Sequence, residues 1–350
     1  MTKAILHIGP EKTGSTALQQ ALKATANPLR AKGWTYEPLL GMWNHAPLVP
    51  LFSGAVEGSH LADATGFSWA GEKAFRNMLI NDIERLVSVT GNKPGGVILV
   101  NELLSSRLTE RKSVSKIINF LLTYFDSITV TFAVKSQVNI VESIFSEELR
   151  WGAANLPDWG RLKGFHWLNF ESLLNLWSGH SNRVSVEILL LQPETKVRSR
   201  TDIVQEFLGL VGVPELWQPR EAALNVHSSI GARGAAILWA YNSLTKDVNW
   251  DDVGIDNPTA FRLRLFDVLR SAQNDRRLRL SPTEANDVLR FYWRGNLALS
   301  SLLSAESAEH FLSQVKPSLS SLERANSFHP MQWYRTYIDH YRHGEEGVGR

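Results

Sequence analysis

Residues Ile5 to Leu18, with the sequence ILHIGPEKTGSTAL, combine the residue types that bind phosphate-like anions. Gly9 and Gly14 lie five positions apart and allow the backbone to turn tightly, with its N–H groups pointing inward. Lys12 adds a positive charge, and the two residues after Gly14 add hydroxyl donors. An apolar run precedes this loop and a helical pattern follows it, so the positive end of a helix dipole adds to the attraction. The segment therefore predicts an anion site at the start of a helix.

The loop differs from the pattern of nucleoside triphosphatases in the position of its lysine. That pattern, G-x-x-x-x-G-K-[ST], places a lysine directly after the second glycine and the next hydroxyl on magnesium. Here Ser15 follows Gly14, and Lys12 lies two residues before that glycine. The usual lysine for the β- and γ-phosphates of ATP is therefore absent, while the glycine-cornered loop is kept.

A second candidate segment follows the apolar run 128–134. It reads KSQVNIVESIFSEELRWG, and its Lys135 and Ser143 lie eight residues apart. Ligands of parallel α/β sheets bind beyond the carboxyl ends of the strands, where a basic residue and a helix hydroxyl can converge on one anion. We therefore expect Lys135 and Ser143 to contribute to the same ligand site.

Together the two segments resemble the sulfotransferase family that uses 3′-phosphoadenosine 5′-phosphosulfate (PAPS). In that family a K-[ST]-G-[ST]-T loop after the first strand binds the 5′-phosphosulfate. The matching residues here are Lys12, Thr13, Gly14, Ser15 and Thr16. The resemblance implies a P-loop nucleoside-triphosphate-hydrolase-like sulfotransferase fold with PAPS as the sulfuryl donor.

The second family element is an arginine at a strand end and a serine eight residues later, which hold the 3′-phosphate. Here Lys135 replaces the arginine and Ser143 matches the serine. A lysine offers a single point charge where arginine offers a planar fork. The segment HIGPEKTGSTALQQAL is similar to the bacterial branch of the family. Two further segments are also similar to that branch, Arg183 to Val213 and Asn225 to Ser229 (NVHSS). The resemblance covers about residues 3–245.

The resemblance implies transfer of a sulfuryl group to a hydroxyl or amine of a carbohydrate or small-molecule acceptor. Such in-line displacement depends mostly on positioning and charge stabilisation. Lys12 is expected to steady charge on the oxygen between sulfur and the leaving phosphate. Gly14, Ser15 and Thr16 are expected to donate hydrogen bonds to the 5′-phosphate.

An acceptor hydroxyl also needs a general base, and two residues are candidates. His45 lies in the irregular segment WNHAPLV, and Glu102 lies just past the apolar run VILV. Both types of side chain accept protons near neutral pH once their pKa is tuned. The family uses a histidine in one branch and a glutamate in others, so the sequence leaves the choice between His45 and Glu102 open.

Two other function classes fit parts of the pattern. A P-loop small-molecule kinase would use ATP and magnesium, but the position of Lys12 argues against it. A non-catalytic nucleotide-binding protein is the second alternative, because the lysine at position 135 departs from the family pattern. We expect no metal, since His340 and His343 have no third ligand at a fitting spacing.

The composition indicates an ordinary globular protein. The 350 residues include 37 basic and 35 acidic side chains, and a net charge of +2 gives no reason to expect nucleic acid as a partner. There is no cysteine, which excludes disulfides and thiolate chemistry. We expect neither a secretion signal nor a membrane span, and therefore a cytoplasmic protein.

The elements that position these residues follow an α/β pattern. Apolar runs of strand length occur at Ala4 to Ile8, Val97 to Val100, Ile128 to Val134 and Val184 to Leu191. Helical spacing fills the gaps between them, which predicts a parallel β-sheet flanked by helices. One such helix contains Ile203, Phe207 and Leu208, with Thr201 as its possible N-cap.

Two regions depart from this alternation. Residues 33–71 are rich in Gly, Pro, His and Trp and predict an irregular insertion on the acceptor side. From about residue 232 onward the pattern is helical. We therefore expect a sulfotransferase-like α/β domain over 1–245 and a helical extension over 246–350 packed on the same domain. The sequence supports no particular oligomeric state and does not reveal the acceptor.

Overall fold

The computed structural model describes most of the chain, as two compact units. The described residues are 2–54, 60–91, 94–154, 158–191, 202–217, 230–246, 248, 257–271 and 278–317. The first unit consists of Met1–Ser136, Gly164–His227 and Arg294–Gln314, and the second of Gln137–Lys163, Ser228–Trp293 and Val315–Arg350. Both units contain residues from either side of position 245, where the sequence predicted a single boundary.

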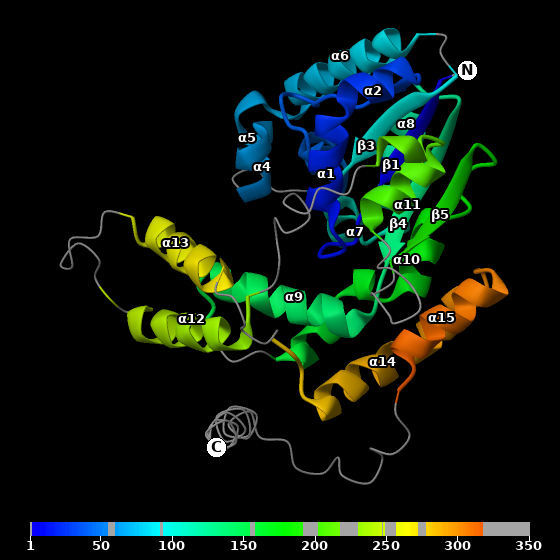
Figure 1. Cartoon of the computed structure of the whole chain (residues 1–350). Helices are drawn as coiled ribbons and strands as arrows, with labels where there is room; N and C mark the ends of the chain where they lie inside the picture. The colour runs from blue at the N-terminus through cyan, green and yellow to red at the C-terminus, as the bar shows by residue number, and fades with distance from the viewer. Residues whose placement is uncertain are drawn as a thin grey trace, which may run out of the picture. The chain divides into compact units, whose positions relative to one another are not determined.

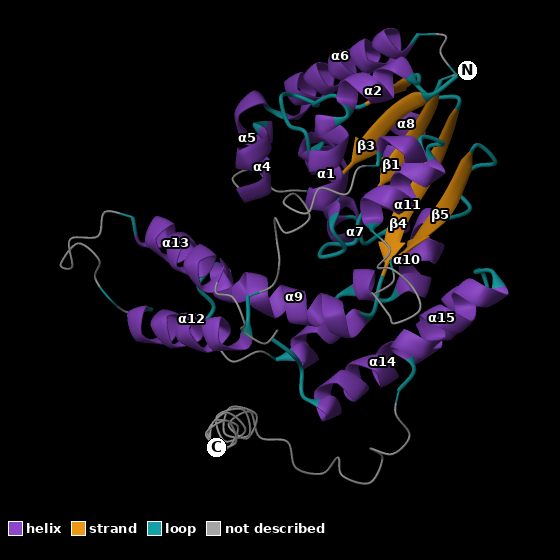
Figure 2. Cartoon of the chain, viewed as in Figure 1, coloured by secondary structure: helices purple, strands orange, loops and turns teal. Residues whose placement is uncertain are grey.

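The first unit is built on one five-stranded parallel sheet in the order β2-β3-β1-β4-β5 (Figures 1 and 2). Its described strands are β1 (Lys3–His7), β2 (Trp34–Thr35), β3 (Gly96–Val100), β4 (Ser127–Val134) and β5 (Val184–Leu190). The α/β class with a parallel sheet is therefore confirmed. The sequence missed β2, because two residues are too few to show a period.

Helices lie on both faces of this sheet. The described α-helices of the first unit are α1 (Ser15–Ala24), α2 (Ala26–Ala31), α3 (Pro50–Ser53), α4 (His60–Thr65), α5 (Phe67–Ala70), α6 (Glu72–Thr90), α7 (Leu103–Arg107), α8 (Arg111–Leu121), α10 (Phe170–Trp177), α11 (Ile203–Leu210) and α15 (Ala305–Val315), which ends at the unit boundary. The short 3-10 helices η1 (Ala46–Leu48), η3 (His166–Leu168) and η4 (Pro214–Leu216) join them. Figure 1 shows α1 and α11 on one face of the sheet and α8 on the other.

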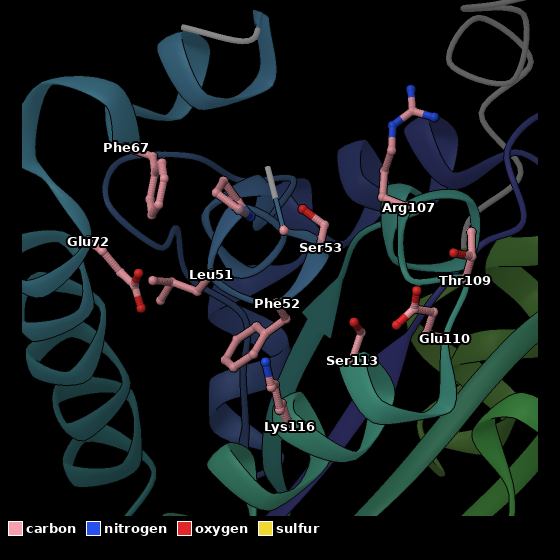
Figure 3. Close-up of a pocket in the computed structure, with 12 residues that line it drawn as sticks. Leu51, Phe52, Ser53, Phe67, Glu72, Arg107, Thr109, Glu110, Ser113 and Lys116 are labelled. Carbon is pink, nitrogen blue, oxygen red and sulfur yellow. The ribbon is translucent and has the colours of Figure 1, made fainter. Parts of the chain in front are cut away.

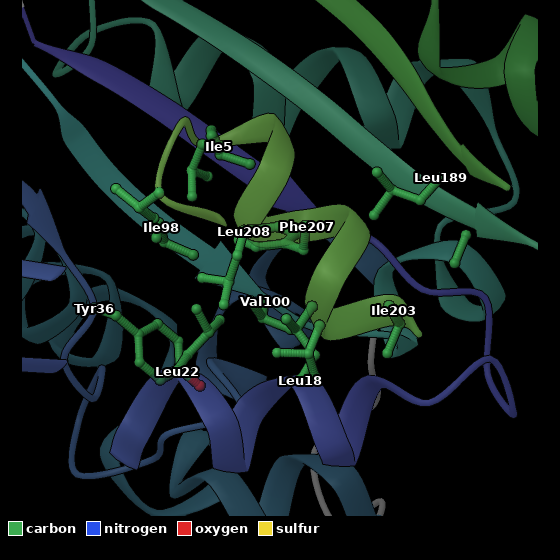
Figure 4. Close-up of a cluster of buried hydrophobic side chains, with 14 of the residues drawn as sticks. Ile5, Leu18, Leu22, Tyr36, Ile98, Val100, Leu189, Ile203, Phe207 and Leu208 are labelled. Carbon is green, nitrogen blue, oxygen red and sulfur yellow. The ribbon is translucent and has the colours of Figure 1, made fainter. Parts of the chain in front are cut away.

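A hydrophobic core fixes α1 and α11 against the sheet (Figure 4). Ile5 of β1 and Ile98 of β3 pack in one buried cluster with Leu18 and Leu22 of α1 and Phe207 of α11. All five side chains are at most 5 % exposed. Burial of such side chains supplies most of the stabilising free energy, at about 25 cal/mol per Å². The helix that follows the candidate loop is therefore held firmly on the sheet.

The start of α11 differs from the prediction by one residue. Asp202 is the N-cap, and its carboxylate accepts a hydrogen bond from the amide of Val204 at 2.7 Å. Thr201, which the sequence predicted as the N-cap, lies outside the described residues. Aspartate is as good an N-cap as threonine, so spacing alone did not separate the two.

The described part of the second unit is helical. Its elements are α9 (Gln137–Arg150), α12 (Ala232–Thr245), α13 (Pro258–Ser271), η2 (Trp159–Gly164) up to its last residue, and the first part of α14 (Pro282–Ser300), which ends in the first unit. Helices α12 and α13 pack against α9 and against each other. The side-chain amide of Asn242 donates to the carbonyls of Leu149 and Ala153 at 2.8 and 3.0 Å. None of the helices in the described ranges is long and apolar enough to cross a membrane.

Candidate anion-binding site

The order of the strands brings three loops to one edge of the sheet. β1 lies in the middle, with β3 on one side and β4 on the other. After β1 the chain runs to the β2–β3 side, and after β3 it crosses to the β4–β5 side. Ligands of open α/β sheets bind at such a reversal, beyond the carboxyl ends of the strands. The loops that follow β1, β3 and β4 all begin at this edge, within the first unit.

Backbone hydrogen bonds fix the start of the β1 loop. The amide of Ile8 donates to the carbonyl of Thr131 at 2.9 Å, and the amide of Ala133 donates to the carbonyl of Gly9 at 2.7 Å. These bonds continue the pairing of β1 with β4 beyond the last residue of β1. The loop therefore leaves the sheet in one defined direction.

The loop then turns through two residues with left-handed backbone. Lys12 has φ 66° and Gly14 has φ 103°, and Gly14 is the N-cap of α1. The hydroxyl of Thr13 donates to the carbonyl of Pro10 at 2.6 Å. Thr13 was expected to bind the ligand, but in this structure its buried hydroxyl closes the turn itself.

The loop ends in a group of hydrogen-bond donors. The amide of Leu18 donates to the carbonyl of Gly14 at 3.1 Å, so the amides of Ser15, Thr16 and Ala17 have no partner inside the helix. The side chain of Ser15 is buried, and its hydroxyl has no hydrogen-bond partner among the described residues. An unsatisfied buried hydroxyl costs about 1–3 kcal/mol. An anion at the start of α1 would satisfy both kinds of donor.

Lys135 connects the end of β4 to this loop. Its ammonium donates to the carbonyl of Lys12 at 2.8 Å. The structure therefore brings together the two basic residues that the sequence predicted in separate motifs. Ser143 is half-buried on α9, which belongs to the second unit, so its convergence with Lys135 stays a prediction.

Glu102 lies against the loop from the β3 side. A Cβ atom added at Gly9 would lie 2.9 Å from the Cα of Glu102. The Oε2 atom of Glu102 accepts a hydrogen bond from the side-chain amide of Gln19 at 3.0 Å. Burial raises the pKa of Glu102, and the charge of Glu11 raises this pKa further, against the lowering effects of Gln19 and Lys12. A carboxylate with a raised pKa is a suitable general base near neutral pH.

His45, the other candidate base, is enclosed in the protein. Its Nδ1 accepts a hydrogen bond from the amide of Val100 at 2.8 Å, so its Nε2 carries the proton and donates to the carbonyl of Glu37 at 2.8 Å. The ring is fully buried, and burial lowers the pKa of His45 to about 4. Through these two hydrogen bonds the ring connects the backbone of the 33–71 region to the backbone of β3. The geometry therefore favours Glu102 over His45.

Two residues near the loop were not singled out in the sequence. His7, the last residue of β1, is buried with its Nδ1 3.0 Å from the hydroxyl of Thr131, and its Nε2 has no partner within the described structure. The sequence feature that could have identified His7 is a polar residue at the end of an apolar strand. Gln19 contacts Glu102. The sequence feature that could have identified Gln19 is its position four residues after Ser15, on the same helix face.

A separate cavity of about 380 Å³ lies in the first unit among α3, Phe67 and the α7–α8 segment (Figure 3). Part of its lining comes from residues 33–71, the predicted acceptor-side insertion. Its charged lining residues are Glu72, Arg107, Glu110 and Lys116. Their formal charges cancel, so the cavity has no net preference for an anion or a cation.

In comparisons with known proteins, the chain matches no protein-family model, no curated protein and no solved structure. Two further motifs named from the sequence, Asn225 to Ser229 and the pair His340 and His343, lie outside the described residues. The evidence for function therefore lies in the β1 loop and the residues around it.

The close contact at Gly9 gives a first prediction. Replacing Gly9 with alanine places a Cβ 2.9 Å from the backbone of Glu102, at a φ of 96° that disfavours any side chain. We expect the free energy of unfolding to fall by about 2 kcal/mol or more in urea titrations. The control is Gly209→Ala, at an open position on α11, which should keep or slightly raise stability. Equal stabilities of the two variants would contradict the loop geometry.

Burial of His45 predicts a pH dependence of stability. The unfolded chain protonates His45 near its ordinary pKa of 6.5, whereas the folded protein keeps the ring neutral down to about pH 4. Lowering the pH through this window should therefore reduce the free energy of unfolding by up to about 1.4 kcal/mol per pH unit for this residue. Urea titrations between pH 7 and 5 should show a shallower slope for His45→Gln. Identical slopes would mean that His45 is not held neutral.

Proposed function

We propose that this chain is a PAPS-dependent sulfotransferase with a P-loop sulfotransferase fold, which transfers a sulfuryl group to a hydroxyl or amine of a carbohydrate or small-molecule acceptor. The observation that carries the proposal is the K-T-G-S-T loop between the central strand β1 and helix α1. Its open helix amides, the buried hydroxyl of Ser15 and two lysines form a donor-rich site for an anion.

The residues present fit a doubly phosphorylated nucleotide that carries sulfate. The amides at the start of α1 and the hydroxyl of Ser15 suit a phosphate group, as at other helix N-termini. Lys12 and Lys135 lie together and supply positive charge. The lysine that binds ATP phosphates in triphosphatases is absent, since Ser15 follows Gly14. When bound, PAPS would supply an activated sulfuryl group on a phosphate leaving group.

Each residue of the loop has a role in this proposal. Ser15 and Thr16 donate hydrogen bonds to the 5′-phosphate, and Lys12 offsets the negative charge that develops on the bridging oxygen. Lys135 is the residue of the first unit that is assigned to the 3′-phosphate. Lys135 also fixes the conformation of the loop by donating a hydrogen bond to the carbonyl of Lys12. Replacement of Lys135 should therefore disturb both phosphate sites.

Glu102 is the proposed general base. It lies directly beside Gly9 of the loop, and its raised pKa favours proton transfer near neutral pH. The hydrogen bond from Gln19 fixes the direction of the carboxylate. The acceptor hydroxyl would lose its proton to Glu102 as its oxygen attacks sulfur.

The donor class is tested by thermal unfolding with 3′-phosphoadenosine 5′-phosphate, ADP, or ATP with magnesium, at equal concentrations. A ligand at 100 times its dissociation constant stabilises the folded state by about 2.7 kcal/mol. We expect clear stabilisation by the 3′-phosphorylated nucleotide alone, reduced in Ser15→Ala and Lys135→Ala. Lys112→Ala, at an exposed position on α8, is the matched control and should behave as the wild type. Stabilisation by ATP and magnesium without preference for a 3′-phosphate would contradict the proposal and favour a kinase.

The base is tested by replacing Glu102 with glutamine. Turnover of PAPS with a panel of sugar and small-molecule acceptors should fall by about 100-fold or more, while donor binding is kept. The wild-type rate should fall as the pH drops through the raised pKa of Glu102, because a protonated carboxyl cannot accept a proton. The variant should lack this acid limb. If His45→Gln rather than Glu102→Gln lost turnover at saturating donor, the assignment of the base would be wrong.

A further inference from the structure

Helices α3 and α8, which pack against each other, form two walls of the cavity in the first unit (Figure 3). The ring of Phe52 on α3 lies against the ring of Phe120 on α8, with centroids 5.4 Å apart. Phe52 and Phe67 line the cavity but are only 4 % and 9 % exposed, so they offer a ligand little apolar surface. The volume of about 380 Å³ is sufficient for a small molecule. Polar groups therefore decide what binds in this cavity.

Three charged side chains of the cavity are not paired with one another. Arg107, Glu110 and Lys116 line the cavity and are exposed to solvent. Within the described residues none of the three side chains forms an ion pair or a hydrogen bond, although their charges are opposite. The fourth charged residue of the lining, Glu72, is paired with Arg76 at 3.4 Å. The cavity thus presents separated positive and negative groups that a ligand can reach.

Polar groups of the cavity also lack partners. Glu110 is the N-cap residue of α8, but its carboxylate accepts no capping hydrogen bond. The hydroxyl of Ser53, on the α3 wall, is buried and has no partner among the described residues. Rotation of this side chain would turn its hydroxyl towards a ligand in the cavity. Ser113 adds a hydroxyl on α8, and Figure 3 shows it between Glu110 and Lys116.

A ligand with a single charge matches this cavity poorly. An anion would be attracted by Lys116 but repelled by Glu110, and the reverse holds for a cation. A molecule that carries both a carboxylate and an ammonium group can pair with both residues. Glu110 and Lys116 lie six residues apart on α8, a rise of about 9 Å, so the two charges of the ligand must be several bonds apart.

We propose that the cavity binds a small zwitterionic molecule of about dipeptide size. Its carboxylate pairs with Lys116 and its ammonium group with Glu110, while the hydroxyls of Ser53 and Ser113 bind the polar groups between the two charges. The inference is independent of the proposed sulfuryl transfer, because it uses neither the β1 loop nor Glu102.

Titration calorimetry of the full chain at pH 7 tests the proposal with three probes. Glycylglycine carries both charges, N-acetylglycylglycine lacks the ammonium group, and glycylglycinamide lacks the carboxylate. We expect glycylglycine to bind with a dissociation constant of about 1 mM, and each single-charge analogue to bind about 3-fold more weakly or worse. Equal dissociation constants for the three probes would overturn the proposal, as would the absence of glycylglycine binding at concentrations up to about 20 mM.

Two variants test which residue pairs with which charge. Glu110→Gln should bind glycylglycine no better than N-acetylglycylglycine, and Lys116→Gln should bind it no better than glycylglycinamide. Each comparison uses two ligands on the same protein, so a loss of folded material does not change the ratio. The matched control is Lys112→Gln, at an exposed position of α8 outside the cavity lining, and it should keep both preferences. Preferences that survive in Glu110→Gln and Lys116→Gln would overturn the proposal.

Discussion

The turn that leaves β1 is held from both sides, and the rest of the site depends on this constraint. The amide of Asn101 after β3 donates to the carbonyl of His7 at 2.8 Å, and the amide of Ala133 in β4 donates to the carbonyl of Gly9 at 2.7 Å. A parallel sheet with β1 between β3 and β4 is what places these partners there. Because the backbone is fixed at this point, the residues that follow can form a tight turn with left-handed positions.

The residues near this turn differ in charge and burial, and these differences give them different roles. The two lysines lie on the loop side, whereas Glu102 is partly buried beside it and has a raised pKa. His7 and His45 are buried completely, and burial lowers the pKa of both, to about 3 and about 4, so they remain neutral. The same physical effect, desolvation, thus disfavours charge on the histidines and makes Glu102 a better proton acceptor.

Local patterns in the sequence predicted the parts of the structure that depend on neighbouring residues. Four strands, the glycine-cornered loop and helix α1 follow from apolar runs, backbone freedom and helical spacing. The burial of His45 could not be predicted, because it depends on the packing of residues 33–71 against β3. The division into two units depends likewise on contacts between distant segments. Strand β2 has only two residues, which is too few for a periodic pattern in the sequence. The hydrogen bond from the Thr13 hydroxyl to the Pro10 carbonyl lies within one turn of the loop, so it leaves no periodic pattern either.

The most direct test of the central claim is hydrogen exchange, measured by mass spectrometry with and without 3′-phosphoadenosine 5′-phosphate. The account predicts slower exchange in the peptide that covers Gly9 to Ala17, because the open amides at the start of α1 would bind the phosphate. The effect should be lost in Ser15→Ala and retained in Lys112→Ala. Protection confined to other segments, or no change in the β1 loop at a nucleotide concentration that stabilises the protein, would contradict the account.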